Sequence, residues 1–256
     1  MARYGLCPLC LAPESRLTDE DVTPKWVRSI LAERLSNPSV RPSKTTVRIC
    51  SGCNSRLNEK FEIPARSVME MLIRGDGSAT LSTSQMTLAA SWIVKTTLIR
   101  LLADSNIGVA PEDASVARDA LVEMIETGRP PSYISVRIGY FSQHIESPST
   151  LLLPPPRRFS IPLEAKVSEN LTANPSLHCL KWELLLSLER DRSTIQPLLD
   201  IRADMDRLVS LWPISDDASE VTWPPKVRLT MAAIEAHTQA WCSPESHYYE
   251  EKPWRD

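Results

Sequence analysis

Cys7-Pro8-Leu9-Cys10 and Cys50-Ser51-Gly52-Cys53 are the two stretches that decide how the first part of this chain folds. Each places two thiols in one tight turn, so four sulfurs can converge on one zinc ion with tetrahedral geometry. The 39 residues between Cys10 and Cys50 exceed the roughly 15–20 of a compact zinc ribbon, so we expect an inserted helix or hairpin. The alternative is ordinary thiols or a redox Cys-x-x-Cys motif, which the lack of a surrounding βαβ pattern disfavours.

The composition is that of an ordinary soluble globular chain. It has 256 residues, 42% hydrophobic and 24% charged, which is enough for one or two cores. No apolar run reaches membrane-spanning length and the N-terminus lacks a signal-peptide core, so we expect no membrane contact, no export and a cytoplasmic location. The seven glycines form no phosphate-binding motif, which argues against a Rossmann or P-loop site.

Charge is distributed unevenly along the chain. Residues 1–75 carry 12 Lys+Arg against 8 Asp+Glu, a net of +4, so the other 181 residues carry −7 of the total of −3. A basic first part is compatible with nucleic-acid contact, although an ordinary solvated surface would show the same excess. The acidic remainder could bind a partner protein.

Periodicity and turn residues predict a mixture of helices and strands. Thr23-Pro24 is typical of a helix start, and Pro64 is expected to interrupt the helix that follows Cys53. Gly75-Asp76-Gly77-Ser78 is the predicted domain boundary. We expect helices at 23–36, 54–63, 65–73, 84–103, 111–126, 195–208 and 225–241, and strands at 45–49, 134–140 and 177–188.

The predicted fold class is therefore α+β. A zinc-stapled module should occupy residues 1–75, and a mixed α+β domain without a recognisable function should occupy residues 76–256. Cys179 and Cys242 stand alone among apolar residues and are expected to be buried packing residues. Trp92 and Trp182 lie in apolar periodicity and are most simply core residues.

Three motifs follow one another in the first part of the chain. Cys7-Pro8-Leu9-Cys10 comes first, Glu20-Asp21-Val22-Thr23-Pro24-Lys25-Trp26 second, and Cys50-Ser51-Gly52-Cys53-Asn54 third, with Glu59 or Glu62 after it. In this order they resemble the HNH endonuclease-like proteins of bacteria and phages. The less specific stretches 88–96, 211–213 and 223–225 are similar to parts of full-length members. The resemblance implies a ββα-metal, treble-clef-like fold and a role on DNA, such as phage defence.

The resemblance also implies roles for individual residues. Glu20 and Asn54 match positions that hold a catalytic Mg²⁺ or Mn²⁺, and Asp21 stands where the family has the histidine that acts as general base. Phosphate contacts are expected on the basic residues of this part, chiefly Lys25, Arg28, Arg48 and Arg56.

Asp21 decides how much of that activity can be expected. An imidazole, with a pKa of about 6.5, accepts a proton at neutral pH far better than an ordinary carboxylate, with a pKa of about 3.9. General-base catalysis is worth roughly 10²–10⁴-fold, so its loss would leave a slow nuclease. The central Asn of the motif also has no clear match, since Thr45 or Thr46 falls there. Two functions stay open: a metal-dependent endonuclease with Asp21 at the base position, and a catalytically degenerate module that binds nucleic acid or assembles with protein. A zinc-stabilised protein that never meets nucleic acid is the third alternative.

Overall fold

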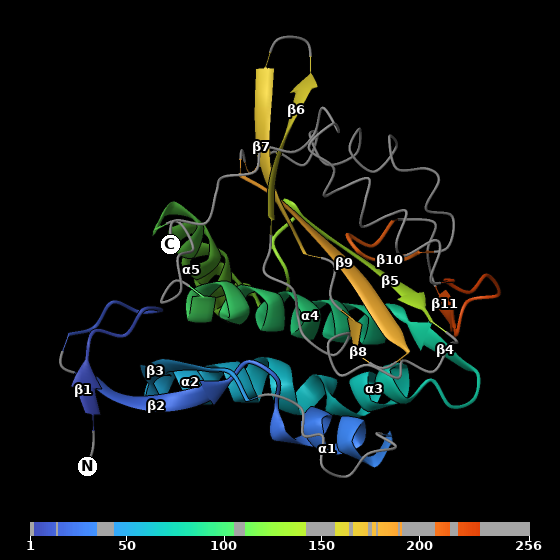
Figure 1. The fold of residues 1–256 in the computed structure, drawn as a ribbon, viewed down its shortest axis with the longest axis horizontal. Coiled ribbons are helices and arrows are strands. Elements are labelled where there is room, and N and C mark those ends of the chain that lie inside the picture. The colour runs from blue at the N-terminus through green and yellow to red at the C-terminus, as the bar shows by residue number, and fades with distance from the viewer. Residues whose placement is uncertain are drawn as a thin grey trace. The chain divides into compact units, whose positions relative to one another are not determined.

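The computed structural model of the chain describes residues 3–13, 15–34, 44–104, 111–141, 157–163, 166–173, 176–177, 179–188, 190, 208–215 and 220–230 (Figure 1). The chain forms two compact units, Met1–Glu70 with Thr87–Pro131, and Met71–Met86 with Ser132–Asp256. Helices and strands are mixed in both, as the predicted α+β class requires. The division differs from the predicted 1–75 and 76–256, because most of the long helix expected at 84–103 packs with the cysteine-bearing segments.

The first unit begins with a three-stranded antiparallel sheet. Its strands are β1 (Arg3–Gly5), β2 (Ser15–Asp21) and β3 (Thr46–Cys50), in the order β1-β2-β3. Thr18 lies opposite Ile49 and Glu20 lies opposite Val47 in the β2–β3 register. Because side chains alternate along a strand, Thr18 and Glu20 share one face of β2. Val47 and Ile49 are buried, so this sheet carries core residues of the unit on β3.

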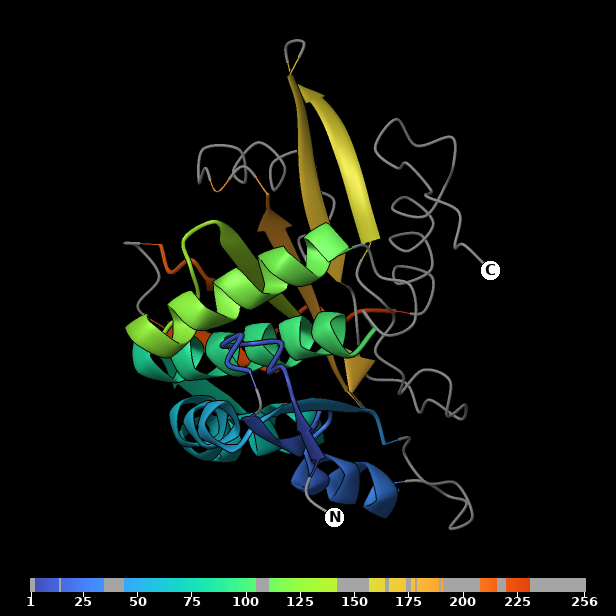
Figure 2. The same ribbon diagram turned by 90° about the vertical axis from the view of Figure 1, so that its left-hand side faces the viewer.

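Five helical segments complete the unit. The helix expected from Thr23-Pro24 is confirmed, since Arg28 donates its backbone N–H to the Pro24 carbonyl. Residues 35–43, which include its expected end, lie outside the described residues. Figures 1 and 2 both show α5 lying beside α4. The segments are α1 (Lys25–Arg34), α2 (Ser51–Leu57), the π-helical turn η1 (Asn58–Glu62) with α3 (Ile63–Arg74), α4 (Thr83–Asp104) and α5 (Pro111–Thr127).

The expected break at Pro64 does not occur. Proline has no N–H to donate, and its ring would clash with the carbonyl four residues earlier in an α-helix. Here the turn before it widens, and the Ile63 N–H donates to the carbonyl of Asn58, five residues back. The helical rod from α2 through η1 to α3 is therefore continuous, with a π turn of the kind that is often found at functional sites.

Helix α4 is the core helix of the structure. By length and composition Thr83–Ala103 could cross a membrane, but 83% of its most apolar window is buried inside the fold. It also carries Lys95, whose side chain is completely buried. Among the described residues this is the one helix that passes the membrane test, and its burial is typical of a core helix of a soluble protein.

The second unit is built on a larger antiparallel sheet. Strands β5 and β9 form its centre, and all eight residues of β9 are buried, so both faces of this strand are covered. A separate pair joins β4 to β11. The strands are β4 (Ala79–Ser82), β5 (Ile134–Tyr140), β6 (Arg157–Leu163), β7 (Lys166–Ala173), β8 (Ser176–Leu177), β9 (Leu180–Ser187), β10 (Val209–Trp212) and β11 (Glu220–Trp223), and the large sheet has the order β10-β5-β9-β7-β6 with β8 on β9.

Gly75 closes α3 in a packed turn, and Asp76, Gly77 and Ser78 after it are exposed. It has a φ of 64°, and a Cβ built on it would lie 2.6 Å from the Cys179 sulfur and 2.6 Å from Cε2 of Tyr140. The Cys179 thiol donates to the last carbonyls of α3, at Ile73 and Arg74. Cys179 is thus buried, as predicted, and the predicted boundary at 75–78 lies within the second unit.

Several other predictions fall on parts of the chain that the structure does not describe. All four histidines, Cys242 and the expected helix at 195–208, apart from its last residue, lie outside the described residues. The expected helix at 225–241 is wrong in its first part, because residues 225–230 are not helical. Leu229 in this stretch instead forms a β-bridge with Phe141 and donates its N–H to the Tyr140 carbonyl.

Candidate metal centre and carboxylate pocket

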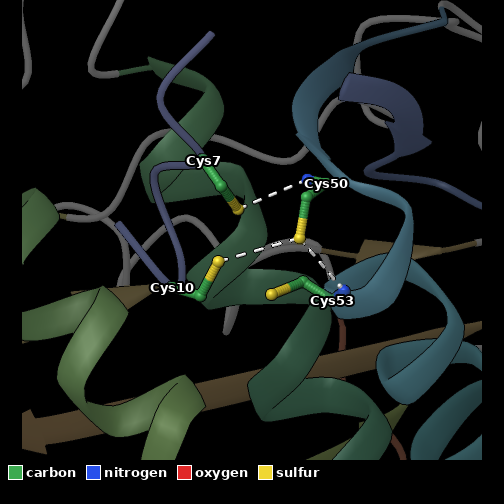
Figure 3. A group of neighbouring side chains, drawn as sticks. All are labelled: Cys7, Cys10, Cys50 and Cys53. Atoms are coloured by element: carbon green, nitrogen blue, oxygen red, sulfur yellow. Dashed lines mark hydrogen bonds between the residues drawn. The ribbon is translucent and has the colours of Figure 1, made fainter. Parts of the chain in front are cut away.

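Cys7, Cys10, Cys50 and Cys53 converge as predicted (Figure 3). Their four sulfur atoms lie within 4.8 Å of one another, and those of Cys10 and Cys50 are 3.7 Å apart. A tetrahedral zinc site with Zn–S bonds of about 2.3 Å requires sulfur–sulfur distances of about 3.8 Å. The four cysteines could therefore hold a metal ion such as zinc.

The backbone of the second knuckle supports the sulfurs. Cys50 is the N-cap of α2, and its sulfur accepts the N–H of Cys53 at 3.4 Å. The N–H of Cys50 in turn donates to the Cys7 sulfur at 3.3 Å. These donors stabilise negative charge on sulfur and orient both thiols, which is what a metal site needs from the groups around its ligands.

The surroundings of Cys7, Cys10 and Cys53 change how easily these thiols ionise. Burial raises the pKa of Cys7, but the backbone N–H groups of Cys10, Cys50 and Leu9 outweigh this and lower it to about 7. Burial and the neighbouring thiols raise the pKa values of Cys10 and Cys53. Cys7 therefore ionises more easily than Cys10 or Cys53, and a cation held between the sulfurs would stabilise the thiolate forms.

The three residues predicted to be catalytic are all engaged with protein groups. Glu20 accepts from the ammonium of Lys95, with 2.5 Å between Oε1 and Nζ. Asp21 lies 2.8 Å from Arg28 Nη2 through one oxygen and 3.4 Å from Lys44 Nζ through the other. The Asn54 amide donates to the Thr18 hydroxyl at 3.0 Å.

Lys95 is the centre of a buried cluster that joins α4 to the sheet. Its nitrogen contacts Oε1 of Glu62 at 2.7 Å as well as Glu20, and its side chain is 0% exposed. The other oxygen of Glu62 accepts the indole N–H groups of Trp26 at 3.2 Å and of Trp92 at 3.1 Å. The two indoles also contact each other, with ring centroids 5.8 Å apart. Every one of these five side chains thus has a specific polar partner.

A pocket of about 300 Å³ opens over this cluster. Glu20, Glu62 and Trp26 belong to both, and Arg66 places its guanidinium carbon 5.9 Å from the ring centroid of Trp26 on the pocket wall. Asn54 is not among the lining residues, whereas Asn58, one helical turn later, is. The pocket is lined by Asp19, Glu20, Asp21, Pro24, Lys25, Trp26, Asn58, Glu62, Ile63 and Arg66.

The residues predicted to contact phosphate differ in their exposure. Lys25, Arg48 and Arg56 have exposed side chains on α1, β3 and α2. Arg28 is only 16% exposed and binds Asp21 and the Thr23 carbonyl. Three of the four can therefore contact a partner at the protein surface, whereas Arg28 stabilises the turn before α1.

Sequence reasoning missed the roles of Glu62, Lys95 and the two indoles. Glu62 was one of two candidates for the acidic residue after the second knuckle, and Trp92 was expected to be a plain core residue. The usable signal was a lone lysine in the middle of an apolar helix, because a buried ammonium requires a carboxylate partner. Nothing in the local pattern identified which carboxylate that would be.

Two chemistries follow from this geometry. The four thiols can bind one metal ion, and the pocket presents ion-paired carboxylates, an amide and an aromatic wall to a ligand. Within the part of the chain that the structure describes, the cysteines form the one group of three or more Cys, His, Asp or Glu ligand atoms that converge tightly enough to hold a metal. The chain matches no protein-family model, no curated protein and no solved structure at a significant level.

Proposed function

We propose that the first unit is a zinc-stabilised, HNH-like module that binds nucleic acid without cleaving it by the metal-dependent mechanism of that family. Four thiolates in two knuckles are typical ligands of structural zinc. The resemblance of the three motifs to HNH proteins supports a role on DNA. The protein would act in the cytoplasm, where its thiols stay reduced.

The state of Asp21 is the observation that carries the proposal. A general base needs a free lone pair aimed at the attacking water. Both oxygens of Asp21 instead face protein cations, Arg28 at 2.8 Å and Lys44 at 3.4 Å. Asp21 therefore supports the turn before α1 better than it supports catalysis.

The exposed cations support the binding part of the proposal. Lys25, Arg48 and Arg56 are exposed. Among the described residues, no carboxylate oxygen lies within 4.0 Å of their charged nitrogen atoms. Arg48 lies opposite exposed Asp19 in the β2–β3 register, so its field is partly offset, whereas Arg56 stands in the last turn of α2. Phosphate contacts by such side chains give affinity without sequence preference and weaken as salt rises.

Neutralising two of these cations should weaken DNA binding. For the variant Arg48→Gln/Arg56→Gln we expect the slope of log affinity against log salt for a short DNA duplex to fall by about 2, because each phosphate contact contributes about 0.9. Fluorescence anisotropy of labelled duplex measures the affinity at each salt concentration, and the slope follows from these values. Lys226→Gln is the matched control, since Lys226 is exposed in the second unit. No binding by the wild type at low salt, or equal binding by wild type and double variant, would contradict the proposal.

A divalent-metal endonuclease is the second candidate, and one observation favours it. Glu20, Asp21, Asn58 and Glu62 line the same pocket, and oxygen ligands of this kind suit Mg²⁺ or Mn²⁺. Cleavage would require the ion pair of Lys95 with Glu20, or that of Arg28 with Asp21, to break when substrate binds. The two candidates are distinguished by whether DNA that is bound in the presence of Mg²⁺ stays intact.

A further inference from the structure

The carboxylates of Glu20 and Glu62 come from different elements and converge on one nitrogen. Glu20 stands near the end of β2, and Glu62 ends the π turn η1. Their nearest oxygens lie 2.5 and 2.7 Å from Lys95 Nζ. The side chains of Glu20, Glu62 and Lys95 are 12%, 9% and 0% exposed. A positive charge is thus held by two carboxylates almost out of contact with solvent.

The indoles of Trp26 and Trp92 fix Glu62 in this orientation. Both donate to its Oε2, which leaves Oε1 directed at the ammonium. Trp92 and Lys95 lie three residues apart on α4, so they project from the same side of that helix and reach the same carboxylate. Both donors belong to the stretch 88–96, which is one of those noted above as similar to parts of full-length HNH-like proteins.

The charges of the cluster are consistent with a charged lysine. Burial lowers the pKa of Lys95, but the attraction of Glu62 and Glu20 outweighs it, so the pKa is raised. Burial raises the pKa of Glu20 against the opposing attraction of Lys95. Two carboxylates around one ammonium leave a surplus negative charge on the floor of the pocket, which a more highly charged cation would compensate more fully.

We propose that the ammonium of Lys95 is the resident cation of this carboxylate centre and fills the place of a divalent metal ion. Glu20 and Glu62 are already within 2.7 Å of one point, and Ca²⁺–oxygen or Mn²⁺–oxygen distances of about 2.1–2.6 Å are only slightly shorter. The wild-type centre therefore takes up no divalent ion, and removing the ammonium opens it to one. This inference goes beyond nucleic-acid binding and is tested without it.

The test compares thermal unfolding of zinc-loaded wild type and Lys95→Ala in millimolar Mn²⁺ or Ca²⁺, with KCl at equal ionic strength as the reference. Lys95→Ala should melt about 10 °C below wild type without divalent ions, because its two carboxylates are left buried and unpaired. Mn²⁺ or Ca²⁺ should then raise its Tm by several degrees, since a ligand that binds only the folded state stabilises it. Wild-type Tm should not respond.

The double variant Lys95→Ala/Glu62→Gln is the control for the metal site. Its alanine leaves the same space, but one ligand is neutral, so most of the metal response should disappear. An unchanged Tm of Lys95→Ala in both ions would overturn the proposal. Electron paramagnetic resonance of Mn²⁺ added to the zinc-loaded wild type gives an independent reading if Lys95→Ala does not fold. A signal of Mn²⁺ bound to the wild type that is absent with Glu20→Gln would overturn the proposal. A signal of free Mn²⁺ alone in the presence of the wild type would support it.

Discussion

Cys50→Ser is expected to unfold the first unit, with loss of the bound zinc. Structural zinc contributes about 10–16 kcal/mol of apparent binding free energy in small zinc modules, which is as large as the whole stability of a typical domain, about 5–15 kcal/mol. Cys50 has two tasks, because its sulfur lies in the four-cysteine cluster and caps α2 by accepting the Cys53 N–H. Metal analysis and amide hydrogen exchange over residues 3–34 and 44–57 measure both effects.

Cys179→Ser is the matched control for this experiment. Cys179 is buried outside the four-cysteine cluster, and its thiol donates to carbonyls at the end of α3, which a serine hydroxyl can also do. It should keep the zinc and lose little stability. Purified wild type without zinc, or Cys50→Ser with unchanged exchange in the first unit, would contradict a structural metal site.

Glu62→Ala is expected to cost about 3–5 kcal/mol of unfolding free energy. Removing one partner of a buried ion pair leaves an under-compensated charge, here on Lys95. It also leaves two indole N–H groups without their acceptor, and Trp92 is completely buried. Glu62→Gln should cost less, because its carbonyl oxygen can still accept from Trp26 and Trp92. Chemical denaturation measures both variants.

Glu70→Ala provides the comparison on the same helical rod. Glu70 pairs with Arg66 at 2.9 Å, with Arg66 58% exposed, and such a surface i,i+4 pair is worth about 0.3–0.5 kcal/mol. The two variants therefore separate a buried ion cluster from an exposed pair. Equal losses in Glu62→Ala and Glu70→Ala would show that the Lys95 cluster does not stabilise the fold.

The four-cysteine cluster and most of the helices could be predicted because their signals are local. Two Cys-x-x-Cys turns, Thr23-Pro24 before α1, and the apolar periodicity of α4 each act within a few residues. Strand β2 was hidden, because Asp19, Glu20 and Asp21 together do not show an apolar alternation. The break expected at Pro64 followed a local rule that the π turn before it circumvents.

The Lys95 cluster could not be predicted, because its members meet only after folding. Glu20 and Glu62 lie 75 and 33 residues from Lys95 in the chain. A buried lysine requires a carboxylate, but the first 75 residues alone contain eight acidic residues, and the pattern does not choose between them. The same contacts explain the extent of the first unit. Lys95 and Trp92 bind Glu20 of β2 and Glu62 of η1, so α4 belongs largely with these elements and not with the residues after 131.

Incubating supercoiled plasmid with zinc-loaded wild-type protein in Mg²⁺ or Mn²⁺, followed by agarose gel electrophoresis with and without protein removal, tests the central claim most directly. We expect retarded plasmid before protein removal and intact supercoiled plasmid after it, because Asp21 and Glu20 are held by Arg28, Lys44 and Lys95. Nicked or linear plasmid that depends on the divalent ion and disappears with Asp21→Ala would contradict the account and establish an active endonuclease.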